Sequence, residues 1–175
     1  MSTPESVPAP PARLILTTPE HLLAFGLGAG LSPLAPGTVG TLLALPLWLL
    51  LFWLPWPLYA GVCVLLFLAG CWLCGASARL LGVHDHGGIV FDEVVGMLVT
   101  CLPLLPALAL TSGPGWLWWL AAFALFRAFD ILKPWPIRWI DRHVHGGLGI
   151  MLDDLLAGLA AAGVLWGAAR LLPLA

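Results

Sequence analysis

Five long apolar stretches constrain the fold of this chain more than any other feature of its sequence. They cover residues 38–54, 58–78, 94–110, 116–131 and 148–172. A bilayer core about 30 Å thick needs roughly 17 to 25 helical residues to cross it, so each stretch is close to or above the required length. Only helices and closed barrels cross lipid, and these stretches lack the two-residue alternation of barrel strands. The sequence therefore predicts membrane-spanning helices.

The scarcity of charged residues supports this interpretation. Of the 175 residues, 9% are charged and 61% are hydrophobic, whereas a soluble domain carries about 25% charged residues. We predict an all-α integral membrane helical bundle of about five crossing or re-entrant helices with an interfacial segment. Residues 1–20 are expected to form a disordered tail and residues 21–175 a single membrane-embedded domain. The glycine-rich residues 21–34 are expected to be interfacial or re-entrant.

The connections between the stretches differ in charge. Five crossings place all the strongly charged segments on one side of the membrane, and the positive-inside rule makes that side cytoplasmic. The basic residues of these segments are Arg13, Arg79, Lys133, Arg138 and Arg142. The formal net charge of −2 argues against a nucleic-acid partner, which would require a basic surface.

The same topology brings carboxylates together at one membrane depth. Asp92 and Glu93 begin the third stretch, Asp130 ends the fourth, and Asp153 and Asp154 begin the fifth. Ionisable residues at this depth are costly and are candidates for function. Clustered carboxylates favour a hard divalent cation such as Mg²⁺.

Two basic residues accompany the carboxylates. Arg127 and Lys133 flank Asp130 at helical spacing and so reach the same layer. Arginine binds phosphate as a bidentate fork and lysine binds it as a point charge. Carboxylates, an implied cation and a basic pair together indicate phosphoryl chemistry.

Other polar residues belong to the same predicted layer. Thr38 follows a segment rich in glycine and proline, where it could cap the first crossing or touch a phosphate. His86 is a candidate proton donor and Asp85 a candidate member of the site. A zinc site at residues 84–86 is disfavoured, because adjacent loop residues seldom converge on one ion. Arg138 belongs to an amphipathic stretch expected at the lipid headgroups.

Four sequence blocks resemble the signature of the phosphatidylglycerophosphatase A family. They are GAGLSPLAPGTVG (28–40), HDHGGIVFDEVVG (84–96), FRAFDILKPWPIR (126–138) and GGLGIMLDDLLAG (146–158). The resemblance covers the chain from about residue 21 onward. It implies a magnesium-dependent enzyme of the bacterial inner membrane that converts phosphatidylglycerophosphate to phosphatidylglycerol.

Together, these observations give a hypothesis for the site. The metal ligands are predicted to be Asp92, Glu93, Asp153 and Asp154. The catalytic residues are predicted to be Asp92, Glu93, Arg127, Asp130, Lys133 and Asp154. The substrate-binding residues are predicted to be Thr38, Asp85, His86 and Arg138. The sequence does not decide which carboxylate is a ligand, a base or a nucleophile, and it leaves the oligomeric state open.

Two other classes of protein compete with this interpretation. A transporter could use the carboxylates as a cation path, but transporter sites tend to lie near the bilayer midplane between repeats, and no repeat occurs here. A phospholipid-synthesising transferase would also bind magnesium and lipid. The paired aspartate pattern typical of alcohol phosphatidyltransferases is missing from the sequence.

Overall fold

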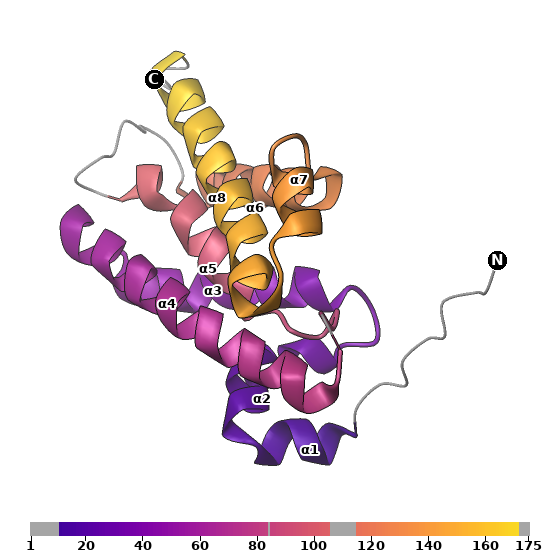
Figure 1. The fold of residues 1–175 in the computed structure, drawn as a ribbon. Coiled ribbons are helices and arrows are strands. Elements are labelled where there is room, and N and C mark those ends of the chain that lie inside the picture. Colours follow the sequence, from indigo (N-terminus) through magenta and orange to yellow (C-terminus); the bar gives the residue numbers. More distant parts are fainter. Residues whose placement is uncertain (1–10, 84, 106–114, 172–175) are drawn as a thin grey trace.

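The structure, a computed structural model, describes residues 11–83, 85–105 and 115–171. Within these ranges it contains helices and no strand, which confirms the prediction of an all-α protein (Figure 1). The elements are α1 (Ala12–Thr17), α2 (Pro19–Ala24), η1 (Gly26–Leu31), α3 (Pro36–Leu51), α4 (Trp56–Leu81), α5 (Phe91–Thr100), η2 (Leu102–Leu104), α6 (Gly115–Leu132), α7 (Ile137–His143) and α8 (Gly146–Leu171).

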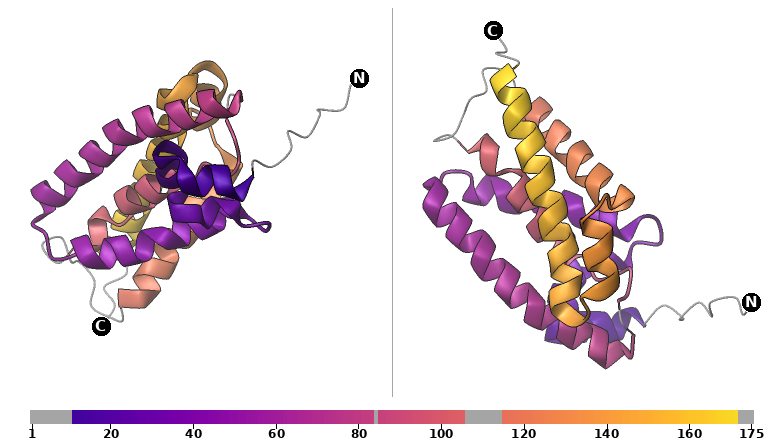
Figure 2. Two further views of the ribbon diagram at one scale, coloured as in Figure 1. Left: turned by 90° about the horizontal axis from the view of Figure 1, so that it is seen from below. Right: turned by 45° about the horizontal axis from the view of Figure 1, so that its top comes forward.

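Helix α8 is the centre of the bundle and contacts α4, α5, α6 and α7, as the right-hand view of Figure 2 shows. Its close packing depends on glycine. A Cβ atom on Gly147 would overlap the carbonyl oxygen of Cys71 in α4, and one on Gly158 would overlap the carbonyl oxygen of Gly96 in α5. The Thr100 hydroxyl also donates to the Gly96 carbonyl at 2.9 Å and lies 3.3 Å from that of Gly158. Small residues let helices pack backbone to backbone, which fixes α8 against α4 and α5.

A core of large side chains fills the space between these helices. Tyr59, Phe126, Met97 and Leu98 are fully buried in one cluster. The Tyr59 hydroxyl donates a hydrogen bond to the Leu98 carbonyl oxygen at 2.7 Å. A buried hydroxyl requires such a partner, and this bond ties α4 to α5.

Two helices are long and apolar enough to cross a membrane, α4 and α8, each of 26 residues. The predicted five crossings are not confirmed within the described ranges. Helix α3 has 16 residues and α5 has 10, and the chain leaves α5 through η2, which contains Pro103. Proline cannot donate the backbone hydrogen bond that would extend the helix. The rest of the predicted third stretch, 106–110, lies outside the described residues.

The predicted disordered tail is wrong from residue 12 onward, because α1 and α2 occupy part of it. Ile15 of α1 and Ala24 of α2 are fully buried in a second cluster with Cys74 and Ala78 of α4. Burial of these apolar side chains offsets the entropy lost when the segment becomes ordered. Residues 1–10 lie outside the described part, and residues 21–34 include the end of α2 and all of η1.

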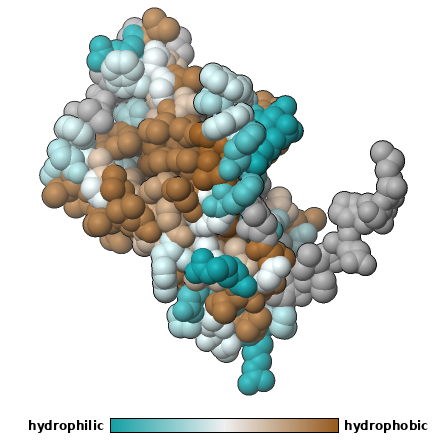
Figure 3. All heavy atoms as spheres, viewed as in Figure 1, coloured by the Kyte–Doolittle hydropathy of each residue, from teal (hydrophilic) through white to brown (hydrophobic). Residues whose placement is uncertain are grey.

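The surface divides into apolar and polar areas (Figure 3). A broad hydrophobic area covers the body of the molecule in this view, and hydrophilic residues gather mainly along its right-hand and lower borders. The exposed large apolar side chains include Leu50 of α3, Leu65 and Trp72 of α4, and Leu120 of α6. An apolar area of this extent marks a surface that meets lipid or another protein.

Candidate active site

The first two turns of α3, the first turn of α5, the last two turns of α6 and the third turn of α8 meet at one end of the bundle. Asp92 and Glu93 are in the first turn of α5, where the helix dipole favours negative charge. Asp153 and Asp154 are buried on α8. Four helices that are remote in sequence therefore position one group of charged side chains.

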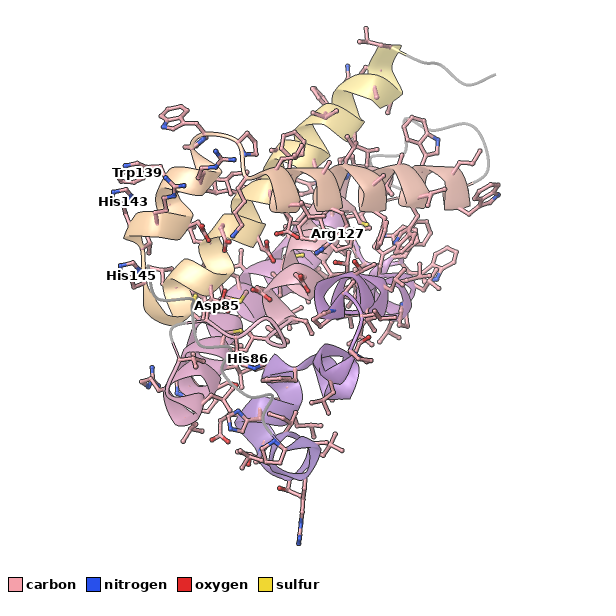
Figure 4. All side chains as sticks on the ribbon, turned by 90° about the vertical axis from the view of Figure 1, so that its right-hand side faces the viewer. Asp85, His86, Arg127, Trp139, His143 and His145 are labelled. Atoms are coloured by element: carbon pink, nitrogen blue, oxygen red, sulfur yellow. The ribbon has the colours of Figure 1, made fainter. Side chains whose placement is uncertain are left out.

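Arg127 of α6 is the centre of the first part of the site. Its Nη1 atom lies 2.6 Å from Asp130 Oδ2, 3.0 Å from Glu93 Oε1 and 3.5 Å from the hydroxyl of Thr41. Figure 4 shows Arg127 pointing from α6 toward the interior of the bundle. This single guanidinium joins α3, α5 and α6, and charge-assisted hydrogen bonds of this kind are among the strongest in proteins.

Glycines of α3 make room for Glu93. A Cβ atom on Gly37 would overlap Glu93 Oε1, and one on Gly40 would lie 2.9 Å from Glu93 Oε2. Thr41, on the same part of α3, donates its hydroxyl hydrogen to the Gly37 carbonyl at 2.8 Å. The glycine-rich block at residues 28–40 thus gives the Glu93 carboxylate its place beside Arg127.

Lys133 is the centre of the second part of the site. Its Nζ atom donates to Asp141 Oδ1 of α7 and Asp153 Oδ2 of α8, both at 2.6 Å. Burial alone would lower the pKa of Lys133, but the two carboxylates outweigh it and raise that pKa above its usual value. Lys133 adopts a left-handed backbone conformation (φ of 41°) directly after α6 ends at Leu132. This conformation turns the lysine away from the α6 axis toward α7 and α8.

The remaining carboxylates lie close to these two parts. Asp154 interacts electrostatically with Asp92, Asp130, Asp153 and Glu93, and Asp92 interacts with Asp85 from the loop before α5. The site thus holds seven carboxyl groups beside the two cations Arg127 and Lys133, so its acidic groups outnumber its basic ones. The seven are Asp85, Asp92, Glu93, Asp130, Asp141, Asp153 and Asp154.

Within the described ranges, three buried polar atoms of the site have no hydrogen-bond partner: Glu93 Oε2, Asp153 Oδ1 and Arg127 Nε. Buried polar atoms seldom lack a partner in native proteins, so these three point to an ion, a water or a ligand. Among the described residues, no group of three His, Cys, Asp or Glu side chains converges closely enough to hold a metal ion. The donor set still fits Mg²⁺ in its chemistry, because carboxylate oxygens are the preferred ligands of this ion and two of them are unpartnered.

The predicted substrate-binding residues occupy three different places. Thr38 is in the first turn of α3, where Ala35 rather than Thr38 precedes the helix, so the predicted cap is wrong. Asp85 lies near Asp92, as described above. His86 accepts a hydrogen bond from the Gly88 N–H at 3.0 Å and its ring packs on that of Phe25. Arg138 donates to the Leu132 carbonyl at 2.9 Å on the outer side of α7.

Two residues of the site were missed by the sequence analysis, Thr41 and Asp141. Thr41 is a lone hydroxyl residue in the apolar stretch after Thr38, and this isolation was the available signal. Asp141 is the only acidic residue in the basic stretch 133–145, and an acid among bases indicates an ion pair. Its partner, Lys133, lies eight residues away, which is too far for a helical pairing to be assumed.

The fold and the site define an all-helical protein with two candidate membrane spans and a charged site of carboxylates, one arginine and one lysine at one end of the bundle. The model of the family phosphatidylglycerophosphatase A matches residues 22–169. The chain therefore belongs to the phosphatidylglycerophosphatase A family, and it is an enzyme, a phosphatase.

Individual relatives agree with the family model. Phosphatidylglycerophosphatase A of Escherichia coli (strain K12) is 50% identical over 155 residues, which cover 89% of this chain and 86% of the relative. The phosphatidylglycerophosphatase A of Haemophilus influenzae is 46% identical over 156 residues, which cover 87% of this chain and 90% of the relative. A Bacteroides thetaiotaomicron protein with the provisional name phosphatidylinositol-3-phosphatase is 40% identical over 144 residues, which cover 79% of this chain and 86% of the relative. No solved structure matches the chain.

Proposed function

We propose that the protein removes the terminal phosphate of phosphatidylglycerophosphate and releases phosphatidylglycerol, in a magnesium-dependent reaction at the cytoplasmic face of the bacterial inner membrane. Two relatives named phosphatidylglycerophosphatase A support this substrate. The observation that carries the chemistry is the set of unpartnered buried atoms, a donor on Arg127 and acceptors on Glu93 and Asp153. A phosphate bound together with a divalent cation would satisfy both kinds of atom.

Asp92, Glu93, Asp153 and Asp154 would hold the magnesium, through oxygens that include Glu93 Oε2 and Asp153 Oδ1. When bound, the ion would supply a Lewis acid for the phosphoryl oxygens and a water of lowered pKa. The gathering of seven carboxyl groups in the site supports the proposal, because a cation offsets the repulsion among carboxylates.

Arg127 would bind the terminal phosphate through the Nε atom that lacks a partner. Its Nη1 atom is held by Glu93 and Asp130, so the guanidinium plane is already fixed before the phosphate arrives. A preorganised donor aimed at developing charge stabilises a transition state without reorganisation. Lys133 would add a positive charge from the side of α7 and α8.

The placement in the membrane rests on α4 and α8. Arg79 is in the last turn of α4, and Lys133, Arg138 and Arg142 belong to the segment that leads into α8 at Gly146. Positively charged connections favour the cytoplasmic side. The phosphomonoester would then meet the charged site at the headgroup level while the acyl chains remain in lipid.

The test is release of inorganic phosphate from phosphatidylglycerophosphate in detergent micelles by the purified protein, with magnesium and with excess EDTA. We expect release with magnesium and none with EDTA. Release that persists in EDTA would overturn the metal mechanism, and no release from folded protein would overturn the substrate. Phosphatidylinositol 3-phosphate is the second substrate to assay, because a relative carries the corresponding name.

A further inference from the structure

A basic hollow lies beside the site, on the outer side of α7. It has a volume of about 320 Å³ and is lined by two arginines, Arg138 and Arg142, and by Lys133, which is also paired with Asp141 and Asp153. Its walls include Lys133, Trp135, Arg138, Trp139, Arg142 and His143. No carboxylate lines it among the described residues, in contrast to the neighbouring site with its seven carboxyl groups. The chemistry of the hollow therefore favours an anion.

The walls of the hollow are held in place by contacts within α7. Trp139 and His143 stack with ring centroids 4.7 Å apart and nearly parallel planes, and His143 Nδ1 lies 2.7 Å from the Trp139 carbonyl oxygen. Figure 4 shows both side chains at the outer edge of the molecule. The Arg138 guanidinium is fixed by its bond to Leu132. A preformed wall of this kind loses little entropy when a ligand binds.

Two exposed tryptophans indicate that the hollow lies at the level of the lipid headgroups. Trp135 is 83% exposed and Trp139 is 53% exposed, and indole rings with adjacent arginines are typical of the membrane–water interface. Lys133 lines the hollow, and its Nζ atom also contacts Asp153 of the site. Lys133 therefore separates an anion bound in the hollow from the carboxylates of the site.

We propose that this hollow binds the phosphodiester of the lipid whose terminal phosphate is cleaved. The proposal rests on the proposed function and adds a specificity determinant to it. In phosphatidylglycerophosphate, Arg138 and Arg142 would hold the phosphodiester and Arg127 would hold the phosphomonoester. Arginine suits this role, because its planar fork matches two phosphate oxygens.

The experiment uses Arg142→Gln, because loss of Arg138 would also remove the bond to Leu132. In micelles of an uncharged detergent, we expect Arg142→Gln to raise both the KM for phosphatidylglycerophosphate and the inhibition constant of phosphatidylglycerol about tenfold. The inhibition constant of inorganic phosphate, which has no diester, should change less than twofold. Arg13→Gln removes an exposed arginine of α1 and serves as the matched control, with all three constants unchanged.

Three results would overturn the proposal. The first is an equal rise in the constants for phosphatidylglycerol and inorganic phosphate, which would assign Arg142 to the monoester site or to structure. The second is no change in any constant. The third is a defect that appears only when a second anionic lipid is added, which would mean that the hollow binds a neighbouring lipid.

Failure of the proposed function is distinguishable from these results. If the wild-type protein releases no phosphate, equilibrium binding of phosphatidylglycerol to the wild type and to Arg142→Gln in the same micelles still tests the hollow. Tighter binding to the wild type, by about tenfold, would support it. Equal binding would overturn it.

Discussion

Arg127 shows at the residue scale why the site needs particular side chains. One of its nitrogens bonds to carboxylates from two helices, while its Nε atom is buried without a partner. A lysine has the same charge but carries its three donors on one nitrogen, so a lysine that holds Glu93 and Asp130 has no second nitrogen to present to a phosphate. The arrangement therefore depends on the shape of the guanidinium as well as on its charge.

Arg127→Lys should lower kcat for phosphatidylglycerophosphate about 100-fold, the loss typical of removing one donor to a transition state. The positive charge remains, so we expect little change in thermal stability. Phosphate release and a thermal melt of the same preparation measure the two effects. Wild-type activity in this variant would contradict the role given to Nε.

Glu93→Gln should also lower kcat about 100-fold, because it removes the negative charge that pairs with Arg127 and a proposed metal ligand. The magnesium concentration for half-maximal activity should be higher in this variant than in the wild type. Glu20→Gln is the matched control, since Glu20 is in α2 and outside the site. A loss of activity of the same size in both variants would indicate a nonspecific effect of charge.

His21 is a buried titratable residue that lies outside the site. Its Nδ1 atom lies 2.8 Å from the Ser77 hydroxyl of α4. Burial lowers the pKa of His21 from its usual 6.5, and the nearby Glu20 opposes this only partly. The folded protein therefore takes up this proton at a lower pH than the unfolded chain does.

The sign of this effect predicts a loss of stability in acid. The contribution of His21 is complete above pH 6.5 and declines as the pH falls below that value, by up to about 1.4 kcal/mol per pH unit. Because the raised pKa of Glu93 acts in the opposite direction over the same interval, the effect of His21 is measured as a difference between two proteins. Lowering the pH from about 7.5 to about 5.5 should lower the melting temperature of the wild type relative to that of His21→Gln. An unchanged difference would contradict this assignment.

At the scale of the elements, glycines decide how closely the helices approach one another. Gly158→Ala places a methyl group against the Gly96 carbonyl of α5 and should lower the free energy of unfolding by about 1–3 kcal/mol. Gly163→Ala is the control on the same helix, because no atom lies within 4 Å of its Cβ position. The midpoint of unfolding in denaturant distinguishes them, and equal midpoints would mean that α5 and α8 are not in close contact.

Gly37→Ala should separate activity from stability. The atom that its methyl group would meet is the end of a flexible side chain, Glu93 Oε1, so the helices need not move. We expect the carboxylate to leave Arg127 and kcat to fall about tenfold, with the melting temperature nearly unchanged. A large loss of stability would show that Glu93 cannot move aside.

Much of the arrangement of elements could be predicted from apolar length and charge, because lipid imposes a simple rule on long helices. Helices α4 and α8 correspond closely to two predicted stretches. Helices α1 and α2 could not be predicted, since each has six residues and their burial depends on α4. In the same way, the charged layer was visible in Asp92, Arg127 and Asp153, but the pairing of Lys133 with Asp141 depends on a left-handed turn that no periodicity reveals.

At the scale of the whole molecule, the proposed orientation gives the protein two ends, one on each side of the membrane. Trp53, at the turn between α3 and α4, is 81% exposed, and Trp135, at the turn between α6 and α7, is 83% exposed. The proposed orientation places them on opposite sides of the membrane. Each tryptophan is also at a level where indole rings favour the interface.

Single cysteines at these positions test the orientation. In right-side-out vesicles, a membrane-impermeant thiol reagent should label Trp53→Cys and not Trp135→Cys, and inverted vesicles should give the reverse. The unsubstituted chain is the control, because its four cysteines are buried or only partly exposed. Labelling of both variants from one side would contradict the proposed crossing.

The glycine contacts of α8 have a further consequence for the timing of catalysis. Because its backbone lies directly against those of α4 and α5 at Gly147 and Gly158, α8 cannot slide or turn to bring Asp153 and Asp154 nearer to Glu93. Closure of the carboxylates on an ion must then come from rotation about side-chain bonds. Such rotations take nanoseconds when they are unhindered, whereas shifts of helix register take microseconds to milliseconds. Loading of the proposed magnesium ion should therefore not limit turnover, and we expect the slow step to be the chemistry or the exchange of the lipid.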